Sequence, residues 1–186
     1  FLQIWDRPRH SVHGVLGQFQ PAHGLTAEEI EAYGLHFRRG RFTRPYITKE
    51  ILESIFGEER AQYVRDTFLD PYKDGLYLPK AEYDTQRKVE ALVEDVNLRD
   101  GLYTLLSDVL FIADTRNPEL YHPRIAAQHA YIYKTLLSES DRGCFNRLYD
   151  DYYYHRNTQY WYKEAMKKLP RLVEATRLLV CAEDLG

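Results

Sequence analysis

Two adjacent carboxylates near the end of the sequence are the residues best suited to do chemistry. Glu183 and Asp184 directly follow the apolar run 178–182. An apolar run of this length that meets charge predicts a short buried strand with acids at its tip. A carboxylic acid placed there can exchange a proton with a bound substrate. Many strand ends are acidic without being catalytic, and Asp184 is better explained by a structural or supporting role.

A second candidate for chemistry is the H-x-x-H pair formed by His10 and His13, whose spacing fits one face of a helix and suggests a metal site. The sequence offers no clear third ligand nearby, and Pro8 disturbs the start of such a helix. We therefore expect no metal.

Composition excludes several classes of function. The chain has 186 residues, a net charge of −3 and a mean hydropathy of −0.55, and no apolar stretch approaches the roughly 20 residues of a membrane helix. We therefore expect neither a membrane nor a nucleic-acid partner. The basic, aromatic segment 36–46 resembles a nucleic-acid patch, but its acidic neighbours favour a solvated loop. Cys144 and Cys181 lie far apart, which suits free thiols in a reducing compartment such as the cytoplasm.

The elements that must position these residues are mostly helical. A capping box, Thr26 to Glu29, predicts the start of a short helix that Gly34 closes. Further helices are expected from Thr48 to Gly57, then up to Pro71, and from Asp84 or Thr85 onward. Segments 70–84 and 114–125 are expected to be loops, whereas 109–112 could end a helix or form a strand. A long aromatic-rich helix is expected over 141–169, with Pro170 ending it or opening a further short helix through Ala175.

Four stretches together resemble the amylomaltase family of 4-alpha-glucanotransferases, which are retaining glycoside hydrolases in mechanism. They are "IWDRPRHSVHGVLGQFQPA" at 4–22, "LYHPRI" at 120–125, "LYDDYYYHRNTQYWYKEAMKKLPRL" at 148–172 and "LLVCAEDLG" at 178–186. The last two in tandem are the most specific. The long separation between the first and last motifs is most similar to the plant cytosolic disproportionating enzymes and their bacterial relatives.

The resemblance implies part of a (β/α)8 barrel with its active site at the carboxyl ends of the strands. The fold class is then mainly α, with a helical insertion flanked by two strand segments of the barrel. Residues 1–22 follow the fourth strand, 23–175 form the insertion, and 176–186 hold the fifth strand. The chain is thus expected to be an internal fragment.

In this family the general acid/base is the glutamate of the E-D-L-G motif, which matches Glu183. The aspartate nucleophile would lie before Phe1 and a third essential aspartate beyond Gly186, so the isolated chain is expected to be inactive. The reaction needs no metal or organic cofactor. Its expected partners are α-1,4-glucans, including maltose, maltooligosaccharides and glycogen-like acceptors.

The resemblance also implies sugar-contacting residues. His10 and Phe19 would flank the sugar cleft, with Asp184 beside the acid/base. His122 and Arg124 lie in a turn-rich segment and either meet glucan hydroxyls or stabilise their loop. Of the consecutive tyrosines 152–154, at least one should be packed and one exposed, because successive helical side chains point about 100° apart.

A non-enzymatic interpretation stays open. The 16 tyrosines suit both sugar stacking and half-buried helix faces. The chain would then be a non-catalytic helical module that binds glucan or contacts another subunit. Composition does not indicate the oligomeric state.

Overall fold

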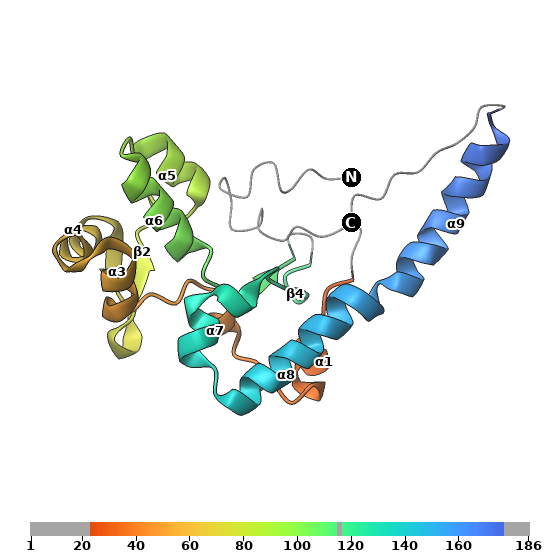
Figure 1. Ribbon diagram of the computed structural model, residues 1–186, viewed down its shortest axis with the longest axis horizontal. Helices are drawn as coiled ribbons and strands as arrows, with labels where there is room; N and C mark the ends of the chain where they lie inside the picture. The colour runs from red at the N-terminus through yellow and green to blue at the C-terminus, as the bar shows by residue number, and fades with distance from the viewer. Residues whose placement is uncertain (1–22, 115–116, 177–186) are drawn as a thin grey trace. The chain divides into compact units, whose positions relative to one another are not determined.

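The computed structural model describes residues 23–114 and 117–176, and they are mainly helical with two small antiparallel sheets (Figure 1). The described residues through Tyr149 form one compact unit, and those from Asp150 on belong to a second. The predicted strand segments within 1–22 and 177–186 lie outside the described residues. A mainly helical region is thus observed where one was expected.

The first unit begins with the predicted capping box. Thr26 Oγ1 accepts the backbone N–H of Glu29 at 3.2 Å, and a Glu29 carboxylate oxygen accepts the N–H of Thr26 at 2.9 Å. This reciprocal pair starts α1 (Ala27–Ala32), and Gly34 follows the helix with a φ of 90°. Both expected ends of the first helix are confirmed. The short α2 (Arg39–Phe42) lies in the segment expected to be a loop.

Helices α3 (Lys49–Phe56) and α4 (Glu58–Phe68) contact each other and are joined by the single residue Gly57. Gly57 has a φ of 76°, which a residue with a side chain rarely adopts. It ends the first helix, as predicted, and also precedes the second.

The segment 70–84 contains a β-hairpin, so the prediction of a loop there was wrong. Strand β1 (Leu69–Pro71) pairs with β2 (Tyr77–Pro79), with Asp70 opposite Leu78. Asp74 and Gly75 have positive φ at the centre of the connecting turn, η2 (Lys73–Gly75), as in a type I′ turn. Asp-Gly is the common sequence for such a turn, so the sequence carried this signal.

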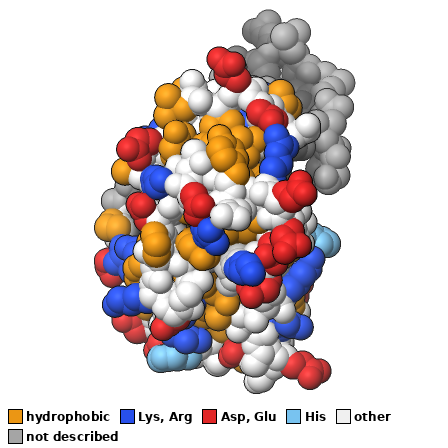
Figure 2. All heavy atoms as spheres, turned by 90° about the vertical axis from the view of Figure 1, so that its left-hand side faces the viewer, with side chains coloured by type: hydrophobic (Ala, Val, Ile, Leu, Met, Phe, Trp, Pro, Cys, Tyr) orange, Lys and Arg blue, Asp and Glu red, His pale blue; other side chains and the backbone are white. Residues whose placement is uncertain are grey.

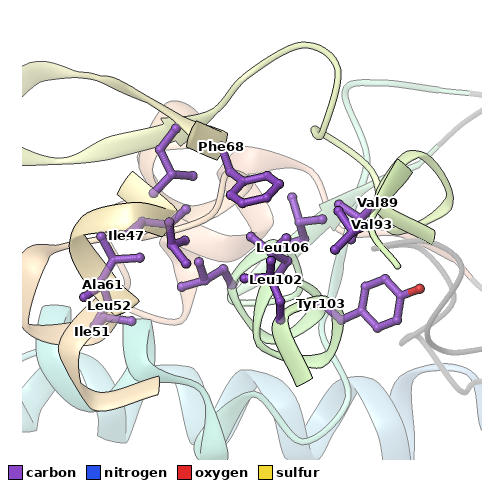
Figure 3. Packing of buried hydrophobic residues seen from close by; sticks show 14 residues of the cluster. Ile47, Ile51, Leu52, Ala61, Phe68, Val89, Val93, Leu102, Tyr103 and Leu106 are labelled. Atoms are coloured by element: carbon purple, nitrogen blue, oxygen red, sulfur yellow. The ribbon is translucent and has the colours of Figure 1, made fainter. Parts of the chain in front are cut away.

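Two more helices complete the first core. Thr85 caps α5 (Gln86–Leu92), as expected, and Asp95 caps α6 (Val96–Leu106). Figure 3 shows residues from these helices, from α3 and α4 and from the hairpin meeting in one apolar cluster. Its most buried members include Ile47, Leu52, Val64, Val89 and Leu105.

A second sheet pairs β3 (Phe111–Ala113) with β4 (Tyr121–Pro123), in the register Ile112 opposite His122. The strand alternative for 109–112 is therefore correct for its last two residues, and the loop prediction for 114–125 was wrong at Tyr121–Pro123. Only β3 was anticipated, as an alternative, because strands this short are hard to recognise without their partner. Rings pack around this sheet from distant parts of the unit: Phe37, Phe42, Phe111, Tyr121 and Phe145.

The chain continues through η3 (Ala127–His129), α7 (Tyr131–Leu136) and α8 (Glu139–Asp150). The second unit holds the π-helical segment η4 (Asp151–Arg156) and α9 (Thr158–Glu174). The predicted single helix over 141–169 is therefore interrupted. Pro170 lies inside α9 rather than at its end, so residues after it are helical but belong to the same helix.

Candidate functional site

The structure describes two of the six predicted site residues. Glu183, Asp184, His10 and Phe19 lie outside the described residues. His122 and Arg124 lie two residues apart, in β4 and directly after it. The candidate site is therefore built here from the β3–β4 sheet.

His122 is buried, with only 3% of its surface exposed. Its Nε2 lies 2.9 Å from Oδ2 of Asp114, the residue that follows β3. The pair links β4 to the residue just after β3. The backbone N–H of Asp114 also donates to the carbonyl of Leu120, which adds a second link at this end of the sheet. These contacts favour the loop-stabilising interpretation of His122 over direct contact with a sugar.

Arg124 is half-buried and lies beyond the opposite end of the β3–β4 ladder from Asp114. Its backbone N–H donates to the carbonyl of Leu110 at 2.8 Å. Its guanidinium donates to the carbonyl oxygens of Ile125 and Ala126 at 3.2 and 3.4 Å. Arg124 thus braces the turn that leads into η3, which again favours the loop-stabilising alternative.

Asp108 is a buried, hydrogen-bonded carboxylate that the sequence analysis did not single out. It is 3% exposed, and its two carboxylate oxygens accept the backbone N–H groups of Tyr131 and Ile132, at 3.1 and 3.0 Å. It therefore caps α7 from a distant part of the chain, where the preceding Ala130 cannot. No local pattern links residue 108 to residue 131, so the sequence held no signal.

Burial raises the pKa of Asp108 to about 6. The bonds from Ile132 and Tyr131 and the charges of Arg124 and Lys134 all act in the opposite direction. A raised pKa in a carboxyl group can mark an acid catalyst. Asp108 is enclosed by the elements it joins, so its geometry is that of a structural cap.

The described residues hold no group of three or more His, Cys, Asp or Glu side chains arranged to bind a metal ion. Pockets lie elsewhere in the first unit. One of about 300 Å³ between α3 and α4 is lined by Lys49, Glu53 and Arg65 among others, and a second of about 200 Å³ lies beside the β1–β2 hairpin.

The face shown in Figure 2 carries basic and acidic side chains interspersed with apolar ones. Such mixing does not create the single-sign field that attracts nucleic acid. No helix among the described residues is long and apolar enough to cross a membrane.

The second unit displays apolar side chains along α9. Tyr162, Met166, Leu169 and Val173 are each about half exposed or more, at 66, 49, 52 and 54%. Their spacing of four, three and four residues places them on one stripe of the helix. Among the neighbouring tyrosines, Tyr152 is 1% and Tyr154 66% exposed, which confirms that the consecutive tyrosines divide between packed and exposed positions.

Comparison with known proteins finds a relative in rice. The whole chain aligns at 32% identity, over 197 aligned positions, with "4-alpha-glucanotransferase DPE2" of Oryza sativa subsp. japonica. The chain spans about a fifth of the length of that protein. No protein-family model and no solved structure matches the chain. The similarity expected from the motifs is thus confirmed: over its full length, this chain resembles part of a 4-alpha-glucanotransferase of the plant disproportionating type.

Proposed function

We propose that the chain is part of a 4-alpha-glucanotransferase that moves glucosyl or maltooligosaccharide units between α-1,4-glucans. The observation that carries this proposal is the 32% identity to the rice enzyme along the whole chain. The proposed substrates are maltose, maltooligosaccharides and glycogen-like acceptors, and the proposed location is the cytoplasm.

The proposed mechanism is a retaining double displacement. Glu183 protonates the leaving glycosidic oxygen while a nucleophilic carboxylate, supplied by a part of the protein outside this sequence, attacks the anomeric carbon. In such sites the two carboxyl groups lie about 5–5.5 Å apart. Glu183 then removes the proton from the incoming sugar hydroxyl, and Asp184, His10 and Phe19 line the cleft.

The proposed context of Glu183 is a strand of a (β/α)8 barrel. Support comes from α9, which ends at Glu174, only a few residues before the predicted strand. In such barrels each helix packs an apolar stripe against the strands. The exposed stripe of Tyr162, Met166 and Val173 is suited to that packing.

The test is a Glu183→Gln substitution in the complete enzyme that contains this sequence, assayed by glucose release from maltose with glycogen as acceptor. Loss of a general acid typically lowers the rate by about 10²–10⁴. The matched control is Glu174→Gln, which removes an exposed carboxylate from the end of α9. Activity of the Glu183→Gln enzyme within tenfold of the control would refute the assignment.

A second candidate function is a helical module that binds glucan or contacts a subunit without catalysis. The exposed rings of Tyr154 and Tyr162 favour it. If maltooligosaccharides quench the fluorescence of nearby Trp161 while Glu183→Gln leaves the activity of the complete enzyme intact, this second function is correct.

A further inference from the structure

The pocket beside the β1–β2 hairpin is formed by two segments that are held together. One segment comprises the second half of α2 and the residues after it, with Arg41, Arg44 and Tyr46, and the other is the hairpin tip with Tyr72, Lys73 and Asp74. The backbone N–H of Tyr77 donates to the carbonyl of Ile47 at 3.0 Å, which fixes the hairpin against the first segment. The two segments that line the pocket are therefore held together by a backbone hydrogen bond of the first unit.

The charges that line this pocket do not balance. Arg41 lies 3.6 Å from the carboxylate of Asp74, so these two charges compensate each other. The side chains of Arg44 and Lys73 have no hydrogen-bond or ion-pair partner within residues 23–114 and 117–176. Two positive charges thus remain at a small pocket of a chain whose net charge is −3. Such a pocket attracts an anion.

Aromatic rings line the same pocket. Tyr72 is 40% exposed, and the guanidinium of Arg41 lies over the ring of Tyr46, 5.7 Å from its centroid. A tyrosine ring offers an apolar face for the C–H side of a sugar and a hydroxyl for its polar edge. The neighbouring guanidinium and carboxylate, on Arg41 and Asp74, can donate to and accept from vicinal sugar hydroxyls.

We propose that this pocket binds a phosphorylated sugar. The phosphate lies between Arg44 and Lys73, and the sugar ring lies against Tyr72 with its hydroxyls toward Arg41 and Asp74. A volume of about 200 Å³ restricts the bound part to about one hexose unit. The proposal rests on this pocket alone and does not require Glu183 to be catalytic.

Isothermal titration calorimetry of the complete protein tests this site with three probes: glucose 6-phosphate, glucose and inorganic phosphate. We expect glucose 6-phosphate to bind at least tenfold more tightly than either of the other two. Its affinity should fall as salt rises, because exposed charge pairs are screened. Equal affinities for inorganic phosphate and glucose 6-phosphate would refute the sugar contact, and equal affinities for glucose and glucose 6-phosphate would refute the anion site.

The decisive variant is Arg44→Ala with Lys73→Ala, which should lower the affinity for glucose 6-phosphate at least tenfold. The control is Arg87→Ala with Lys163→Ala, which removes the same charges from exposed residues that do not line the pocket. Unchanged thermal unfolding shows that both variants are folded. The site is refuted if both double variants lose affinity for glucose 6-phosphate to a similar extent, or if neither of them loses affinity. Because the readout is binding, failure here leaves the transferase proposal untouched, and failure of the Glu183 test leaves this one untouched.

Discussion

Asp108 Oδ1 accepts a hydrogen bond of 3.0 Å from the backbone N–H of Ile132, 24 residues further along the chain. This bond makes a buried carboxylate the cap of α7. Burial raises the pKa of Asp108 from 3.8 to about 6, so the folded protein takes up this proton at a higher pH than the unfolded chain does. The raised pKa therefore increases the free energy of unfolding. This contribution is complete well below pH 4 and is lost as pH rises through 6.

An Asp108→Asn substitution should remove this pH dependence. Between pH 4 and 7 the wild-type protein should lose roughly 2 kcal/mol of unfolding free energy from this group relative to the variant. Urea unfolding at several pH values gives the unfolding free energies of the wild type and the variant. Subtracting one from the other cancels the contributions of the carboxylates that both proteins share. The control is Asp70→Asn, at an exposed position in the hairpin. If Asp108→Asn and Asp70→Asn show the same pH slope, Asp108 does not titrate as described.

His122 should contribute to stability and not to sugar binding. His122→Ala leaves Asp114 without its 2.9 Å partner and opens a buried space, so we expect a loss of about 1–3 kcal/mol. His129→Ala, at an exposed position, should cost much less. Chemical denaturation gives both values. A drop in maltooligosaccharide affinity at unchanged stability would instead place His122 in contact with sugar.

Gly101 allows α6 to approach α3. A Cβ atom added at Gly101 would lie 2.2 Å from Cε1 and 2.5 Å from Cζ of Phe56. Gly101→Ala should therefore destabilise the protein by about 1–3 kcal/mol, reduced by the better helix propensity of alanine. At Gly40, where a Cβ meets nothing within 4 Å, the same change should be neutral or stabilising.

A second substitution isolates the clash at Gly101. In a Phe56→Leu background the smaller side chain can give way, so Gly101→Ala should cost less than it does in the wild type. Additive effects of the two changes would show that the ring of Phe56 is not the obstacle.

The capping box at α1 predicts a local effect. Thr26→Ala removes the acceptor for the Glu29 N–H and should cost about 1 kcal/mol. Thr104→Ala changes an exposed threonine in the interior of α6, whose hydroxyl bonds back to the carbonyl of Asp100, and should cost little. Thermal unfolding compares the two, and equal losses would contradict a capping role for Thr26.

The correct sequence predictions rest on local signals. The caps at Thr26, Thr48 and Thr85 and the break at Gly57 each act within four residues, so sequence alone reveals them. The β3–β4 sheet depends on pairing between distant residues, and strands of three residues leave too little alternation to detect. Pro170 was expected to end its helix or to open a further short one, but it lies inside α9, which tolerates the lost backbone bond.

The candidate site residues divide in the same way, into those that a local motif reveals and those that only the folded structure brings together. The motif around Glu183 was recognisable from family resemblance, and the relative from rice confirms that resemblance. Asp108 and the pocket at Arg44 and Lys73 depend on residues that folding brings together from separate segments. Only coordinates can reveal such groupings.

The single-residue junction at Gly57 also bears on how the chain reaches this structure. Helices α3 and α4 meet without an intervening loop, so bringing them together restricts very little chain entropy. Contacts this close in sequence form quickly, whereas the β3–β4 sheet must wait for more distant segments. The α3–α4 pair is therefore positioned to act as an early nucleus, on which the remaining parts of the first unit can condense.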